Sequence, residues 1–146
     1  MKKEDSVGFL LKRIHTEQFA LFEENFNEDT KVNFNIQIQF KLDRQNKMIG
    51  IFTGFTFEQE QKPFLKIEIS CHFKIDENSW NNFIEDKKAK IIIPKGFLAH
   101  LTMISVGTAR GVLFAKTEGS SFSNFIIPAI NVVEIIETDA VFSLPK

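Results

Sequence analysis

The sequence contains no tyrosine, one tryptophan and one cysteine among its 146 residues. A single cysteine, Cys71, excludes an internal disulfide and agrees with a reducing compartment. Histidine is scarce as well, because His15, His72 and His100 lie far apart and share none of the short spacings that metal sites use. We therefore expect no metal and no other cofactor.

Neither sign of charge is in excess. The chain has 18 basic and 19 acidic residues, which give a net charge of −1, and it contains no run of like charges. Strong attraction to phosphate backbones or to anionic membranes is therefore not expected, and nucleic acid is a poor candidate partner.

Long apolar stretches are missing too. The N-terminal residues lack the apolar region of a signal peptide, and no stretch approaches the roughly 18 apolar residues that a membrane helix needs. We expect no membrane insertion and a cytoplasmic protein. The length predicts one domain over residues 1–146.

Catalytic motifs are also absent, with no GxSxG elbow and no phosphate-binding glycine loop. Glu68 interrupts an apolar run, but alternation places it on the polar face of its strand. Arg110 lies in an apolar helical stretch, where a helix-face ion pair, or a packed stem with the charge at the surface, is favoured over a ligand contact. The sequence therefore predicts no enzyme.

Alternating apolar residues are what the sequence has most clearly. Residues 32–42, VNFNIQIQFKL, alternate without error, and the same period recurs in 48–58 and 64–75, after an apolar strand over 7–23. Residues 32–58 are interpreted as a hairpin. Cys71 falls in the apolar register of the last strand, which favours a buried thiol over a reactive one.

The period then changes to that of helices. A short helix is expected within 77–88, with Asp76 or Asn78 as its N-cap, and one long helix from Phe97 to about Lys116, stopped by the following EGSS. Residues 119–146 are read as a loop followed by a short strand or helix near 130–137. This order predicts an α+β layer of four strands and one long helix.

The long helix is apolar around most of its circumference, which indicates cover on two sides. One helix is also too little to cover four apolar strands, so we infer oligomerisation. The residues expected at the interface are apolar or small and lie at helical spacing: Met103, Gly107, Gly111 and Phe114. Tolerance of glycine without an interface is the alternative reading of Gly107 and Gly111.

Three short stretches resemble SecB, the cytoplasmic export chaperone of bacteria. FLLKRIHTEQF resembles its first strand, with Arg13 to Thr16 in place of R-I-x-T. The stretch around Ala109 and Arg110 resembles its long helix, with residues 119–122 as the exit, and PAIN (128–131) resembles A-P-V-N with the proline displaced by one. The likeness covers most of the chain, because the four strands also follow the family's order.

The resemblance implies a four-stranded antiparallel sheet with a long helix packed on it, a dimer of dimers, and grooves that hold unfolded polypeptide. It also implies a second C-terminal helix, for which few residues remain after Asn131, so we expect that helix to be short or missing. In the family, acids five and nine residues after the signature arginine dock the motor ATPase SecA. Here those positions hold Gln18 and Phe22, and neighbouring Glu17 and Glu23 would point to the opposite face unless a bulge intervenes.

Our first hypothesis is an ATP-independent chaperone that holds unfolded or partly folded clients, in protein export or for a dedicated client, with SecA as a conditional partner. The seventeen phenylalanines supply apolar area without a hydroxyl to satisfy. The candidate client-binding rings are Phe52, Phe55, Phe57, Phe64, Phe122 and Phe125. The alternatives are a chaperone of a toxin–antitoxin system, a small-ligand-binding or enzymatic sheet-plus-helix domain, and a purely structural oligomer.

Overall fold

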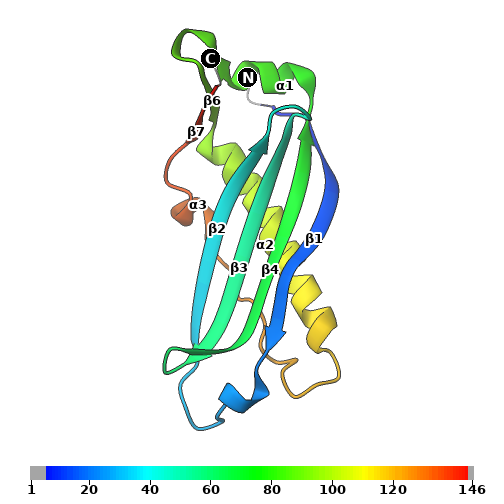
Figure 1. Cartoon of the computed structure of the whole chain (residues 1–146), viewed down its shortest axis with the longest axis vertical. Coiled ribbons are helices and arrows are strands. Elements are labelled where there is room, and N and C mark those ends of the chain that lie inside the picture. The colour runs from blue at the N-terminus through cyan, green and yellow to red at the C-terminus, as the bar shows by residue number, and fades with distance from the viewer. Residues whose placement is uncertain (1–5, 145–146) are drawn as a thin grey trace.

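A computed structural model describes residues 6–144 and contains a four-stranded antiparallel sheet with one long helix along one face (Figure 1). The strands pair in the order β1-β4-β3-β2. Their bounds are β1 (Phe9–Leu21), β2 (Asn33–Asp43), β3 (Met48–Gln59) and β4 (Lys62–Ile75), with a short 3-10 turn, η2 (Glu23–Asn25), after β1. The predicted α+β class and the predicted hairpin are confirmed.

The two faces of the sheet follow the alternation of the sequence. On the helix side, β3 and β4 bury a continuous apolar layer, whereas the outer face carries the polar residues of β2 and the charged residues of β4. Fully buried members of the layer are Ile49, Ile51, Phe55, Ile67, Ile69, Cys71, Phe73 and Ile75. Cys71 has no exposed area, as predicted, and burial raises the pKa of its thiol.

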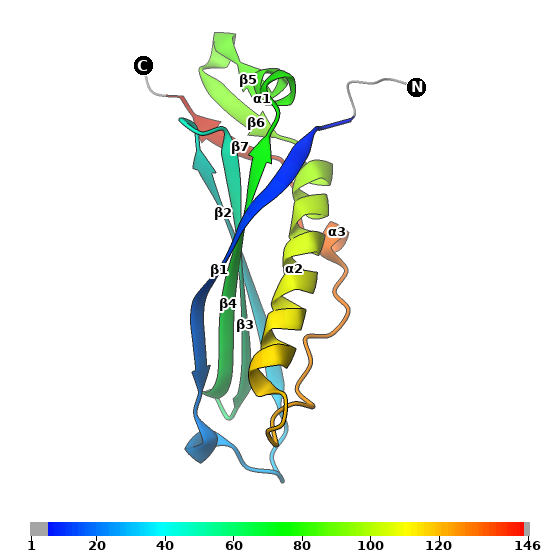
Figure 2. The same ribbon diagram turned by 90° about the vertical axis from the view of Figure 1, so that its right-hand side faces the viewer.

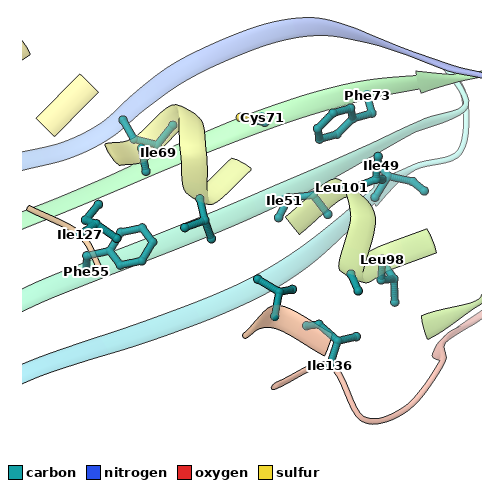
Figure 3. Close-up of a cluster of buried hydrophobic side chains, with 14 of the residues drawn as sticks. Ile49, Ile51, Phe55, Ile69, Cys71, Phe73, Leu98, Leu101, Ile127 and Ile136 are labelled. Atoms are coloured by element: carbon teal, nitrogen blue, oxygen red, sulfur yellow. The ribbon is translucent and has the colours of Figure 1, made fainter. Parts of the chain in front are cut away.

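Helix α2 (Lys95–Thr117) supplies the other half of the core. It runs across β3 and β4 (Figure 2), and it buries Leu98 and Leu101 on the side that faces the sheet (Figure 3). The Asp139 carboxylate accepts a 2.9 Å hydrogen bond from the Lys95 backbone N–H and so satisfies one free donor of the first turn. Beyond its C-terminal end, Gly119 has φ +82°, a left-handed conformation that favours glycine.

By length and composition, α2 could cross a membrane, because an 18-residue window within it has a mean hydropathy of 1.4. The expectation that no stretch approaches such a span was therefore wrong. Part of this helix is buried against the sheet, and the core helix of a globular protein passes the same test of length and composition.

The segment between β4 and α2 is more structured than the sequence indicated. Helix α1 (Glu77–Phe83) begins at Asp76, whose carboxylate accepts a 2.7 Å hydrogen bond from the Ser79 backbone N–H. A second sheet follows, with the order β5-β6-β7, built from β5 (Ile84–Glu85), β6 (Lys90–Ile93) and β7 (Ala140–Ser143); the 3-10 turn η3 (Asp86–Lys88) lies between β5 and β6. Its strands were not predicted, because runs of two to four residues carry almost no periodicity.

After α2 the chain returns along the same face of the sheet. This return segment, residues 119–139, contains one short helix, α3 (Val132–Ile135), which lies beside α2 in both views (Figures 1 and 2). The second helix is therefore short, as expected. The return segment buries Ile127, Val132 and Ile136. It helps α2 to cover the sheet, so incomplete cover by one helix is a weaker reason for oligomerisation than the sequence suggested.

Candidate functional site

Five phenylalanine rings gather at the end of the sheet where β3 turns into β4. Phe64 lies at their centre, with ring centroids 4.9 Å from Phe26 and 5.0 Å from Phe125. Phe57 and Phe122 complete the cluster at 6.4 and 6.2 Å from Phe64. This aromatic cluster joins the connection after β1, the β3–β4 turn and the start of the return segment.

The structure places most of the predicted client-binding rings in the core. Phe55, Phe57, Phe64 and Phe122 are between 0% and 5% exposed, so none presents its ring to a bound polypeptide. We therefore no longer propose these four as client contacts. Sequence reasoning could not separate them from surface rings, because a ring in the apolar register looks the same in either role.

Phe52 and Phe125 are half-buried, in different places. Phe125 is the more open edge of the aromatic cluster. Phe52 lies alone on the outer face of the sheet, where the Lys41 ammonium sits 4.3 Å from its centroid and the His72 ring packs edge-on at 5.6 Å. A Cβ at Gly50 would lie 3.0 Å from the Phe52 ring, which explains the glycine in this strand.

The apolar face of β2 is the part of the sheet that the chain covers least. Its inward residues Phe34, Ile36, Ile38, Phe40 and Leu42 are all half-buried, although the same register of β3 is buried. A cleft of about 260 Å³ runs between β2 and α3, and we call it the β2 groove; its walls are Ile36, Ile38, Phe40 and residues 135–138. β2 is also an edge strand of the sheet.

The α3 wall of this groove adds apolar area that the sequence analysis did not assign. Ile135 is 42% exposed and lines the groove together with the buried Ile136. The signal for these residues was the β-branched run VVEII, which was predicted to be a short strand or helix without any role. The groove itself could not be read from sequence, because its two walls are about a hundred residues apart.

The residues predicted for an oligomer interface share one exposed stripe of α2. Met103 and Phe114 are 48% and 47% exposed, and Gly107 and Gly111 lie between them with no heavy atom within 4 Å of an added Cβ. The stripe is flat and apolar, so a second helix could approach it closely. It remains a predicted interface.

Arg110 forms no ion pair with the described residues and bonds to the backbone instead. Its guanidinium donates hydrogen bonds to the backbone carbonyls of Ile127 and Pro128, at 2.7 and 2.8 Å. These two bonds fix the middle of the return segment against α2. Arg110 thus joins two of the three stretches that resemble SecB, because it holds Pro128, the first residue of PAIN.

The position of Glu17, one of the acids near the expected SecA-docking positions, is set by a hydrogen bond on the outer face of the sheet. A β-bulge lies between Thr16 and Gln18, and the Glu17 carboxylate accepts a 2.7 Å hydrogen bond from the Ser70 hydroxyl. Glu17 therefore lies on the same face as Ser70 and His72, because the bulge that the sequence argument allowed as an exception is present. Glu23 lies in the 3-10 turn after β1.

His72 should make stability depend on pH. Burial, and then the Arg13 charge, lowers its pKa from 6.5, while Glu17 opposes the shift. Because its pKa is lowered, His72 binds fewer protons in the folded state than in the unfolded state. The contribution of His72 to the free energy of unfolding is therefore complete above the pKa of the unfolded state, and it is lost as the pH falls through the pKa of the folded state. We expect the free energy of unfolding to decrease from about pH 7 to about pH 5. Urea titrations should show a shallower decrease for His72→Gln, while the exposed-site control His100→Gln should follow the wild type.

Within residues 6–144, no three or more His, Cys, Asp or Glu side chains gather closely enough to hold a metal ion. The Glu17, Ser70 and His72 cluster does not form a nucleophilic triad either. Ser70 donates its proton to the carboxylate and lies 3.0 Å from the His72 Nε2, so serine rather than histidine is the central member.

No protein-family model and no curated protein matches this chain. Among solved structures, a SecB-like chaperone of Mycobacterium tuberculosis, in complex with a ChAD peptide from the HigA1 antitoxin, superposes with a TM-score of 0.46 at 9% identity, over 84% of this chain and 90% of that chain. A Streptococcus agalactiae protein of unknown function gives a TM-score of 0.38 at 16% identity, over 86% and 98%. Both TM-scores are below 0.5.

Proposed function

We propose that this protein is an ATP-independent chaperone that holds unfolded or partly folded polypeptides in the cytoplasm. The observation that carries the proposal is the β2 groove, where an apolar strand face and an apolar helix lie open beside each other. The sequence resemblance to SecB supports it independently. Holding requires apolar area and no reacting group, which fits the lack of catalytic motifs in the sequence.

Two physical contributions favour an extended client in the groove. Each apolar client side chain that it buries contributes about 1.5–3 kcal/mol before ordering costs, so several weak contacts give tight holding. β2 is an edge strand, so a client can add a strand to the sheet through backbone hydrogen bonds. Backbone pairing is independent of client sequence, as holding requires.

We further propose that the chain assembles through the exposed stripe of α2, ultimately as a dimer of dimers. Met103→Asp would place a charge in a closely packed helix pair, and Gly111→Leu would keep the helices apart. Either substitution should convert the oligomer to smaller species in native mass spectrometry, with the circular dichroism of the sheet retained. The stripe faces open space, so neither change should disturb the fold of one chain.

A wild type that is already monomeric at micromolar concentration would contradict the assembly proposal. Val141→Asp is the matched control, because Val141 is 54% exposed on β7 and outside the stripe. Its mass distribution should equal that of the wild type.

The choice between general export and one dedicated client depends on SecA. Glu17 is on the outer face but its carboxylate is engaged by Ser70, and Gln18 and Phe22 occupy the positions of the family's docking acids. We propose weak SecA binding and a specialised role, of which a toxin–antitoxin chaperone is one form. Submicromolar, salt-sensitive binding of SecA from the same cell would contradict this and favour general export.

The holding activity itself is tested by aggregation. Purified protein should suppress the light scattering of a chemically unfolded client after dilution, without nucleotide, at a stoichiometry near one oligomer per client. Suppression that requires ATP, or scattering equal to that with serum albumin at the same mass, would contradict the proposal.

A further inference from the structure

The start of α2 separates two cavities that meet above its first turn. One, of about 700 Å³, lies toward α1 and the start of β1, and the other, of about 870 Å³, lies toward α3. Gly96 and His100 line both, so these two residues form the ridge between the cavities, and we call the two cavities with this ridge the crest cleft.

Gly96 makes the ridge between the cavities low. It lies one helical turn before His100, on the same side of α2. Both residues are exposed, and a Cβ at Gly96 would meet no heavy atom within 4 Å. A chain can therefore pass from one cavity to the other over bare helix backbone.

The cavity on the α1 side has aromatic walls. The Phe97 ring lies 5.6 Å from Phe9 and 5.9 Å from Phe83, and His100 packs against Phe9 at 5.6 Å. Its described lining includes no Lys, Arg, Asp or Glu. This chemistry suits one large apolar side chain and no charge.

The cavity on the α3 side combines an apolar floor with a negative rim. Val133 is 64% exposed there, beside the buried side chains of Ala99 and Ile136. Glu134 and Glu137 also line this cavity. Lys95 is the only Lys or Arg among the described residues that line it. This side suits a second apolar side chain with a positive charge next to it.

We propose that the crest cleft binds an extended polypeptide segment that carries two large apolar side chains four residues apart, on the same face of the segment, the second followed by Lys or Arg. An extended chain rises about 3.3 Å per residue, and a helix is about 10 Å wide, so this spacing bridges the two cavities. Charge complementarity to Glu134 fixes the direction of the segment. This proposal rests on the proposed chaperone function and specifies which segment of a client the protein binds in the crest cleft.

The test uses a short fluorescent peptide with Phe and Leu four residues apart, Lys after Leu, and Ser or Gly elsewhere. Fluorescence anisotropy should show binding to the full-length protein, weakened at least tenfold, on the order of 1.4 kcal/mol, by Gly96→Leu, which fills the ridge. Gly96→Ala is the matched control and should bind within about twofold of the wild type, since its methyl leaves the ridge low.

Charge exchange tests the direction. Glu134→Lys should weaken the Lys peptide and strengthen the same peptide with Glu in place of Lys, whereas Glu28→Lys, an exposed acid in the connection after β1, should change neither. Equal binding to Gly96→Leu and the wild type, or indifference to the Lys/Glu exchange, would overturn the proposal. Binding of N-acetyl-phenylalanine amide as tightly as the peptide would also overturn it and assign the cleft to a small ligand.

Peptide binding and suppression of aggregation test the crest cleft and the chaperone function separately. Suppression of client aggregation by the wild type, with no binding of the peptide, would overturn the cleft proposal and leave holding in the β2 groove intact. Peptide binding that responds to Gly96→Leu, without any suppression of aggregation, would support the cleft and contradict the holding function.

Discussion

Replacing Phe64 with alanine should lower the free energy of unfolding by about 3–5 kcal/mol. Phe64 has no exposed area and is the central ring of the aromatic cluster, within 6.4 Å of four other phenylalanine centroids. Its removal leaves a cavity, and the rings around it come from three separate segments that can collapse only partly. Urea denaturation followed by circular dichroism measures the change.

Phe52→Ala is the matched control for this prediction. Both rings were candidates for client contact, but Phe52 is half-buried on the outer face and borders a lysine and a histidine rather than other phenylalanines. We expect a loss of about 1 kcal/mol or less. Equal losses for the two variants would contradict the division into a core ring and a surface ring.

Replacing one apolar residue on each wall of the β2 groove with serine should remove most of the protein's affinity for clients. Ile38→Ser and Ile135→Ser together remove one apolar contact from each wall. If each contact contributes about 1.5–3 kcal/mol, the dissociation constant for an unfolded client should rise about 100-fold or more. Competition against a fluorescent unfolded client measures the constant.

The control for the groove variant is Val141→Ser, which removes an apolar side chain that is 54% exposed on β7, outside the groove. Its client affinity should equal that of the wild type. An unchanged affinity in a folded Ile38→Ser, Ile135→Ser double variant would assign client binding to another surface. Folding of the double variant is checked by its urea midpoint.

The sequence predicted the main sheet and the long helix because each has many residues of one period. Residues 32–42 alternate through an entire strand, and a one-residue slip would expose every apolar side chain. The short strands β5, β6 and β7 were missed for the opposite reason, since runs of two to four residues show no period and β7 pairs with a strand far from it in the chain. The return segment was placed only roughly, because its position depends on Arg110 and two backbone carbonyls rather than on a pattern.

The candidate site was harder to predict than the fold. Burial of Phe55 or Phe64 depends on what packs above the strand, and alternation gives only the side on which a residue lies. The bulge that turns Glu17 to the outer face leaves no mark in the sequence, although it decides which face presents the carboxylate. On α2, helical spacing alone places Met103, Gly107 and Phe114 on one stripe, and their role as an interface stays a prediction.

The most direct test of the holding function is the native mass of the particle with an unfolded client. Wild-type protein mixed with a chemically unfolded client, without nucleotide, should give a complex of one oligomer with one client chain. The Ile38→Ser, Ile135→Ser variant should keep the oligomer but lose most of that complex. Absence of a client complex with the wild type, or equal complexes with both proteins, would contradict the account of the β2 groove as the holding surface.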